Sequence, residues 1–428
     1  MRVMKNRHSG GIAAMLALLA VLSASTPAFA GGLYVYEIGV PDQMFASAGR
    51  EAIGRDASTS YTNPAAMTRL KQSEVLLGVQ PIYADVRFEP GSATTQTGGD
   101  GGNAAGFVPS LGSFYVHSFT DRIKGGLAFN TYVGGGLHYD DQWAGRYYAQ
   151  ESSILTLAGN LSGAYRVNDW LSLGVGFTTL YAKLKMSAAI PNAEPIGDAR
   201  ITAEDDNVGF GGNASILLEP SPATRIGLVY RSQIQVSMHD VGSLENVGPL
   251  LGGVLQASGL VDADVDLDFT FPQMVHAAVY HDLGDKLSIM IGLGWEDWTE
   301  FGDLGVTLDS STDSSFNADL HIHDTWHGSV GFEYRPVARW RVGTGIAYDS
   351  GAVNDKDRTP ALPLSRQWRW GAGFEHDVAE TWTVGFQYTL VELGNAPIDR
   401  ARPLPGTLKG SYEDNMVHAF NFSVRKRF

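Results

Sequence analysis

The 428-residue sequence contains no cysteine, so no disulfide bond can stabilise the folded protein. Such a chain suits a protein that crosses an oxidising compartment before it folds. Basic residues are also scarce, because 31 Lys and Arg stand against 46 Asp and Glu, which gives a formal net charge of −15. A chain this acidic is not expected to bind nucleic acid.

Residues 1–30 differ in composition from the rest of the chain. A basic start (Arg2, Lys5 and Arg7) precedes an apolar stretch at 10–22, and small residues follow at Ala28-Phe29-Ala30. This order is typical of a secretory signal peptide. Its removal would leave 28 Lys and Arg against 46 Asp and Glu, a net charge of about −18.

After residue 30, no apolar run reaches the ~18–20 residues that a membrane-spanning helix needs. If the chain spans a bilayer, it must therefore do so as a closed β-barrel, the other structure that pairs every backbone group. The 51 glycines and the 11% aromatic content suit such a barrel. They suit a soluble β-sandwich almost as well, and no linker divides the chain into domains.

Strict alternation of apolar and polar residues predicts strands. In 381–390 one face carries Trp382, Val384, Phe386, Tyr388 and Leu390, and the other face is polar or small. Fourteen such segments occur, an even number, as single-chain bacterial barrels require. They are 74–88, 108–119, 122–136, 152–166, 169–186, 205–219, 224–238, 262–281, 285–301, 322–335, 339–349, 366–377, 381–392 and 413–428.

The links between these segments separate the barrel from the sandwich. Short links such as 120–121, 167–168 and 282–284 alternate with long ones such as 239–261 and 302–321. Tight turns at one rim and long loops at the other are the pattern of an outer-membrane barrel, whose apolar face contacts lipid and whose polar face lines the lumen. A sandwich has no reason to alternate so regularly.

The C-terminal segment has a further signal. Phe420, Phe422, Val424 and the terminal Phe428 share one face of the last predicted strand. A final aromatic residue that ends an alternating strand resembles the signal recognised by the outer-membrane assembly machinery. We therefore expect that machinery and the outer-membrane lipids to be partners of this chain.

Residues 47–70 resemble the N-terminal hatch of FadL-type outer-membrane transporters of hydrophobic compounds. The resemblance rests on Ser47-Ala48-Gly49, Ala52-Ile53, Asp56-Ala57-Ser58, Asn63-Pro64-Ala65 and Met67-Thr68-Arg69-Leu70. By its own chemistry, Asn63 is a good helix N-cap and Pro64 suits the first helical position, which predicts a short helix over 64–69. Shorter matches follow in the family's order, among them Phe271-Pro272-Gln273-Met274, Asp324-Thr325-Trp326 and Tyr348-Asp349.

The resemblance implies an all-β membrane protein: a monomeric, 14-stranded antiparallel transmembrane β-barrel with a small N-terminal helical hatch inside the lumen. Its parts would be a signal peptide (1–30), the hatch or plug (31–70) and the barrel (71–428). Its implied function is passive uptake of hydrophobic molecules (long-chain fatty acids, alkanes or aromatic hydrocarbons) across the outer membrane of a Gram-negative bacterium. In this family cargo is captured at apolar outer loops, passes a hatch gate, and leaves sideways at a kinked third strand.

Candidate residues follow for each step. The gate is expected at Asn63, Pro64 and Ala65. Capture is expected in the loop 239–261, which is unusually apolar for an outer loop, although a loop helix packed on its neighbours would explain the same residues; they are Val247, Leu250, Leu251, Val254 and Leu255. The lateral opening is expected at Gly134, Gly135 and Gly136, where glycines permit a bend, or simply begin a loop.

The sequence gives weaker indications of metal binding or catalysis. His321, His323, Asp324 and His327 could suggest zinc, but they also suit a polar strand start, and Asp262, Asp264, Asp266 and Asp268 suit a polar lumen face better than calcium. Local spacing supports neither a Ser-His-Asp arrangement nor a phosphate-binding loop. We therefore expect no catalytic residues, metal or cofactor. The alternative functions are an outer-membrane barrel enzyme acting on lipids and a general porin for polar solutes.

Overall fold

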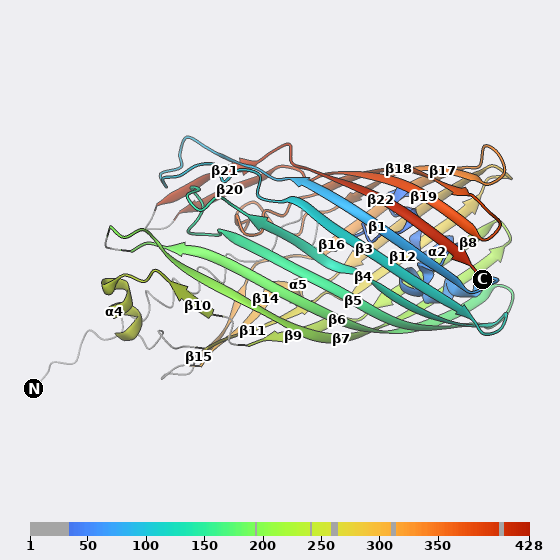
Figure 1. Ribbon diagram of the computed structural model, residues 1–428, viewed down its shortest axis with the longest axis horizontal. Helices are drawn as coiled ribbons and strands as arrows, with labels where there is room; N and C mark the ends of the chain where they lie inside the picture. Colours follow the sequence, from blue (N-terminus) through green and yellow to red (C-terminus); the bar gives the residue numbers. More distant parts are fainter. Residues whose placement is uncertain (1–33, 193–194, 240–241, 258–263, 310–313, 402–405) are drawn as a thin grey trace, which may run out of the picture.

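The computed structural model describes residues 34–192, 195–239, 242–257, 264–309, 314–401 and 406–428 (Figure 1). The predicted signal peptide lies outside these residues. In the described part of the chain, no helix is both long enough and apolar enough to cross a membrane.

Fourteen antiparallel strands form one closed barrel, as the sequence predicts (Figure 1). Each strand pairs with the next one along the chain, and pairing of the first strand with the last completes the ring. The strands are β1 (Glu74–Asp85), β3 (Gly106–Ser118), β4 (Ile123–His138), β5 (Glu151–Arg166), β6 (Leu171–Ile190), β7 (Ala199–Ser221), β8 (Thr224–Arg231), β12 (Met274–Asp282), β13 (Leu287–Glu296), β16 (Thr325–Tyr334), β17 (Trp340–Asp349), β18 (Gln367–Asp377), β19 (Trp382–Glu392) and β22 (Met416–Arg427).

The alternation read from the sequence places the side chains of the wall. On β5, Leu155, Leu157 and Leu161 are exposed on the outer face, whereas Thr156 and Asn160 are buried on the inner face. Outward apolar residues suit contact with lipid tails, and inward polar residues can pair with one another or with whatever fills the lumen. The inside of the wall is therefore a polar surface on which a separate element can dock.

The long loops carry most of the remaining structure, at the end of the barrel opposite the short turns (Figure 1). They contain β9 (Ile234–Met238), β10 (Gly242–Glu245), α4 (Pro249–Ala257), β11 (Asp264–Phe271), α5 (Thr299–Gly302), β14 (Asp303–Asp309) and β15 (Ser314–Asp319). A three-stranded sheet of β2 (Phe88–Pro90), β20 (Ala396–Ala401) and β21 (Thr407–Tyr412) covers another part of this end.

Two predicted strands are interrupted in the structure. Segment 224–238 divides into β8 and β9, and segment 262–281 divides into β11 and β12 at Pro272 and Gln273. Proline has no backbone N–H to donate, so it interrupts the hydrogen bonding of a strand. Beyond the break, β9 and β11 pair with each other in a smaller sheet with β14 and β15.

Residues 34–70, called the N-terminal segment below, are almost completely buried. They form four short helices: η1 (Pro41–Phe45), α2 (Arg50–Ile53), α3 (Thr59–Thr62) and η2 (Pro64–Arg69). The helix η1 contacts β16 to β19 and β22, α2 contacts β8 and β12, and α3 and η2 together contact β3 to β7. The segment therefore touches the wall around most of the ring, near the short-turn end (Figure 1).

Glycines of the wall let the backbone of the N-terminal segment approach closely. A Cβ added at Gly78 would lie 1.9 Å from the carbonyl oxygen of Gly39, and one added at Gly227 would lie 1.9 Å from that of Glu51. Any larger residue would collide with the segment at these points. We call six such positions the glycine contacts: Gly78, Gly112, Gly174, Gly227, Gly345 and Gly371.

Candidate transport site

Strands β3 and β4 separate in their outer halves. Among the described residues, their backbone pairing runs from Ser118–Lys124 only as far as Gly112–Asn130. Beyond that point β3 remains paired with β1 as far as Gly106, and β4 remains paired with β5 as far as His138. The wall therefore contains a gap between two strands that are each held on their other side.

The three glycines of the predicted opening lie at this gap. The register between β4 and β5 shifts between Thr131 and Gly134, and Gly134, Gly135 and Gly136 follow directly. Two consecutive residues at the shift, Tyr132 and Val133, are both buried, which breaks the alternation of the strand. A bulge of this kind bends the strand and ends its pairing with a neighbour.

The start of the N-terminal segment covers the inner side of the gap. Tyr34 forms an isolated antiparallel bridge with Val133, and the Val35 amide donates to the Tyr132 carbonyl at 3.4 Å. The Ser110 hydroxyl of β3 lies 3.4 Å from the carbonyl oxygen of Glu37. Residues 34–37 therefore occupy part of the space where β3 and β4 would otherwise pair.

A cavity of about 250 Å³ extends through this region. Its lining includes inward-facing residues such as Ser110 and Ile154 and outward-facing residues such as Pro109 and Leu155. Gly134, Gly135 and Gly136 also line it. Because residues from both faces of the wall share one cavity, the cavity connects the lumen side of the gap with the outer face of the barrel.

Charged groups line part of the cavity. The Arg369 guanidinium donates from Nη1 to both carboxylate oxygens of Glu37 at 2.7 Å, and from Nε to Asp349 at 2.8 Å. His327 Nδ1 lies 2.7 Å from the other oxygen of Asp349. Glu37, Arg369 and Gln367 line the cavity. Charge-assisted hydrogen bonds of this type are among the stronger hydrogen bonds in proteins.

A second set of contacts holds Tyr36, the neighbour of Glu37. Its hydroxyl donates to Glu296 at 2.9 Å, its ring stacks on His327, and Arg50 donates to its carbonyl oxygen at 2.7 Å. Burial alone would lower the pKa of Arg50, but the carboxylate of Asp42 raises it above its ordinary value, so the guanidinium stays charged.

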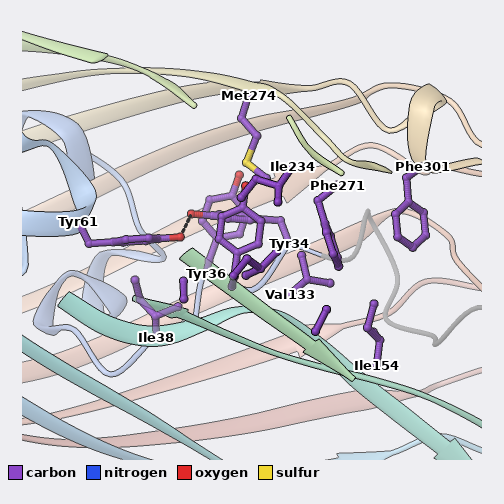
Figure 2. Close-up of a cluster of buried hydrophobic side chains, with 14 of the residues drawn as sticks. Tyr34, Tyr36, Ile38, Tyr61, Val133, Ile154, Ile234, Phe271, Met274 and Phe301 are labelled. Atoms are coloured by element: carbon purple, nitrogen blue, oxygen red, sulfur yellow. Dashed lines mark hydrogen bonds between the residues drawn. The ribbon is translucent and has the colours of Figure 1, made fainter. Parts of the chain in front are cut away.

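Buried apolar side chains surround this point (Figure 2). They come from the N-terminal segment, from β4 and β5 beside the gap, and from β9, β11, β12 and α5. The hydroxyls of Tyr34 and Tyr61 lie 3.5 Å apart within the group. We call these residues the apolar cluster: Tyr34, Tyr36, Ile38, Tyr61, Val133, Ile154, Ile234, Phe271, Met274 and Phe301.

The expected helix at 64–69 is present as η2, with Asn63 at its N-cap position and Pro64 at its start. The prediction that the Asn63 side chain caps this helix is wrong, because it forms no hydrogen bond with a backbone N–H of η2. Its amide donates instead to the carbonyl oxygens of Glu51 at 2.5 Å and Ile216 at 3.3 Å. Ala65 donates its backbone N–H to the Ser215 hydroxyl at 3.0 Å, so this turn is attached to β7.

The apolar residues of the loop 239–261 lie on and beside α4. Leu250 is 63% exposed and Val254 is 43% exposed, whereas Leu255 is only 8% exposed. Val247 and Leu251 are half-buried. Leu255 packs on the protein, as expected for a loop helix packed on its neighbours. Leu250 and Val254 present an apolar surface outward.

The histidines considered as metal ligands have separate partners. His323 Nε2 lies 2.7 Å from the Asn354 amide, Asp324 accepts hydrogen bonds from Trp295 and Thr299, and His327 pairs with Asp349. In the described part of the chain, no group of three acidic or histidine residues is placed to hold a metal ion.

The alternating aspartates at 262–268 also form no metal-binding group among the described residues. Asp262 lies outside the described residues, and Asp266 lies 3.2 Å from His239 Nδ1.

The pair of Glu37 and Arg369 was not predicted, because its members lie 332 residues apart. Neither residue belongs to a local pattern that could indicate the other.

Comparisons with known proteins agree with this geometry. The profile of the family described as "Outer membrane protein transport protein (OMPP1/FadL/TodX)" matches residues 21–428. The chain is 27% identical to the "Long-chain fatty acid transport protein" of Escherichia coli O6:H1, over 81% of this chain and 83% of that protein. It is also 27% identical to "Outer membrane protein P1" of Haemophilus influenzae, over 86% and 88% of the two chains.

Solved structures show the same fold. A Pseudomonas aeruginosa FadL homologue superposes with a TM-score of 0.82 at 22% identity, covering 93% of this chain and all of that one. The Ralstonia pickettii toluene transporter TbuX has a TM-score of 0.66 at 18% identity, with 94% and 99% covered. This chain therefore belongs to the OMPP1/FadL/TodX family of outer-membrane transport proteins, and it is a multi-pass barrel of the Gram-negative outer membrane.

Proposed function

We propose that the protein is a passive channel for hydrophobic molecules that releases its cargo sideways through the gap between β3 and β4. The observation that carries this proposal is the cavity lined by residues of both faces of the wall. A lateral exit matters because apolar cargo that left through an aqueous lumen would lose the favourable free energy of apolar surroundings. The printed names of relatives, a fatty acid transport protein and a toluene transporter, support hydrophobic cargo.

Capture is proposed at α4. Leu250 and Val254 are exposed at the long-loop end, where cargo arrives from outside. From there the apolar cluster offers the next favourable surface, because it joins side chains of β11 and α5 to side chains of β4 and β5 beside the gap. Long-chain fatty acids, alkanes and aromatic hydrocarbons all share the property this surface selects, which is apolar area.

The N-terminal segment is proposed to act as hatch and gate. Its helices contact the wall around most of the ring, and Tyr34 bridges to Val133 at the gap, which supports this proposal. Cargo can reach the gap when residues 34–37 move aside, while the helices behind them remain on the wall. The turn at Asn63, Pro64 and Ala65 is proposed to hold those helices through its contacts with α2 and β7.

Two finer points belong to the same proposal. A single chain closes the ring, so the working unit is proposed to be a monomer. The exposed Phe428 follows β22, and its backbone N–H donates to the carbonyl of Ser73 at 2.9 Å. We propose that the outer-membrane assembly machinery recognises this strand before the ring closes.

To test lateral release, leucine side chains are introduced on β4 so that they fill the cavity. A Cβ at Gly134 or Gly136 would meet its nearest atom at 3.2 Å, so leucine can enter there with a small adjustment. We expect Gly134→Leu with Gly136→Leu to lower uptake of a labelled fatty acid or toluene at least about tenfold. Gly163→Leu on β5 is the control, because a Cβ there meets nothing within 4 Å.

Heat-modifiability on gels checks that each variant is folded. Normal uptake by the folded double variant would overturn lateral release. Hydrolysis of a chromogenic ester by the wild-type protein would instead support the alternative, a barrel enzyme that acts on lipids. Conduction of small ions through an open wild-type lumen would support a general porin.

A further inference from the structure

We propose that Lys426 binds the phosphate group of an anionic phospholipid of the periplasmic leaflet, on the lipid-facing surface where the last strand of the barrel meets the first. This inference concerns the outside of the wall and does not depend on the transport path. It assigns one lipid to one position, whereas the alternation of side chains explains only contact with lipid in general.

The first observation is the place of Lys426 on the wall. It lies near the end of β22, at the short-turn end of the barrel (Figure 1). Short turns of outer-membrane barrels face the periplasm, so this end meets the headgroups of the periplasmic leaflet. Phe422 and Val424 precede Lys426 at alternate positions and are exposed, so the lysine belongs to the lipid-facing side of the strand.

The second observation is that two aromatic rings hold its ammonium group. Nζ of Lys426 lies 5.0 Å from the centroid of the Trp382 ring and 5.0 Å from that of the Phe428 ring. Such contacts are attractive, because the faces of aromatic rings carry partial negative charge. Two rings on one ammonium group fix its position, but they do not neutralise it, and its three N–H groups still need acceptors.

The third observation is the lack of a carboxylate at this ammonium group. The neighbouring cations of β22 have one, because Nη2 of Arg425 and Nη2 of Arg427 each lie 3.8 Å from Oδ1 of Asp377. Lys426 forms no ion pair within the described ranges, and its charge contacts only the two rings. At the height of the headgroups, lipid phosphates are the anions at hand, and cationic side chains near the membrane surface attract them.

The surface beside the ammonium group suits the rest of a phospholipid. In the register of the wall, Lys426 stands beside Val75 of β1, and Val424 stands beside Leu77. Leu77 and Val424 are exposed and apolar, so an acyl chain can lie along the seam between β22 and β1 while its phosphate reaches Lys426. The Trp382 ring is also exposed, and such rings favour the level of the headgroups.

The preference for an anionic phospholipid follows from net charge. Every phospholipid carries the phosphate, but in a zwitterionic one a cationic group of the same headgroup offsets it. One lysine close to a membrane surface favours an anionic lipid by about fivefold. The site is therefore expected to select by charge and to tolerate different acyl chains.

The test measures lipid binding by the full-length protein with native mass spectrometry, using dioleoylphosphatidylglycerol and dioleoylphosphatidylcholine at equal concentrations. For the first bound lipid, wild type should prefer phosphatidylglycerol by about fivefold. Lys426→Gln should bring this ratio close to one, and Lys426→Arg should keep it. Trp382→Leu should lower it, because the ammonium group loses one of the rings that hold it.

Lys286→Gln is the matched control, because Lys286 is an exposed lysine of the same rim, in the turn between β12 and β13. Heat-modifiability identifies any variant that fails to fold. Equal binding of the two lipids by wild type would overturn the inference. So would a ratio that survives in folded Lys426→Gln, or one that falls equally in Lys286→Gln.

Competition with inorganic phosphate separates a lipid site from a site for free phosphate. An excess of sodium phosphate should leave phosphatidylglycerol bound, because the free ion cannot replace the contacts of the acyl chains. Release of the lipid from wild type at the same ionic strength of sodium chloride that leaves it bound would overturn the assignment to a lipid.

Discussion

The glycine contacts provide the sharpest test of how the N-terminal segment is held. At Gly227 an added Cβ would lie 1.9 Å from the carbonyl oxygen of Glu51 and 2.3 Å from its carbonyl carbon. Real Cβ atoms essentially never come within 3.0 Å of such atoms, so Gly227→Ala requires a movement of about 1 Å. Strand β8 is paired on both sides, so α2 is the element that moves.

The magnitude follows from two costs. Overpacking of this kind costs about 1–3 kcal/mol. The same carbonyl accepts the side-chain amide of Asn63 at 2.5 Å, and loss of that hydrogen bond adds about 0.5–1.5 kcal/mol. A total of about 1.5–4.5 kcal/mol would raise the population with α2 displaced roughly 10- to 1,600-fold.

Hydrogen exchange of backbone amides measures this population directly. Ala52 and Ile53 donate to the carbonyl of Gly49 at 2.8 and 2.9 Å, so their protection reports on α2. We expect their protection to fall by that factor in Gly227→Ala, while amides of β5 keep theirs. Gly163→Ala should change neither, because a Cβ there meets nothing within 4 Å. Equal protection of Ala52 in both variants would refute docking through close glycine contact.

Three further predictions concern the wall, the capture loop and the turn at residue 63. The purified protein should be heat-modifiable, with a circular dichroism spectrum dominated by strand; a helical spectrum would contradict the barrel. Leu250→Asp with Leu251→Asp should weaken cargo binding while the barrel stays folded, whereas Gln256→Asp on the same helix should not; equal binding by both would remove α4 from capture. Asn63→Ala should loosen α2 by about 1–2 kcal/mol, because the buried carbonyl of Glu51 loses its amide donor; unchanged exchange at α2 would show that this bond is dispensable.

The wall could be predicted from the sequence because its signal is local. Successive side chains of a strand point to opposite faces. Trp382 and its alternate neighbours therefore face outward, toward lipid, whereas Gln387 faces inward. The bend at Gly134 was also indicated locally, by three consecutive glycines. The cap at Asn63 was predicted wrongly because its side-chain amide donates to a distant acceptor, the carbonyl oxygen of Glu51. No local pattern connects Glu37 with Arg369, since they meet only because the N-terminal segment docks against the inner face of β18.

The glycine contacts also relate the N-terminal segment to the register of the strands. They lie on six different strands, and each faces a particular backbone atom of the segment; at Gly345, for example, an added Cβ would lie 2.1 Å from the carbonyl oxygen of Phe45. A slip of β17 by two residues would keep the same face inward but could place Ala347 at that point, and its methyl group would collide with the carbonyl. The segment therefore disfavours this misaligned register of β17, so its docking helps to select the correct alignment of the wall.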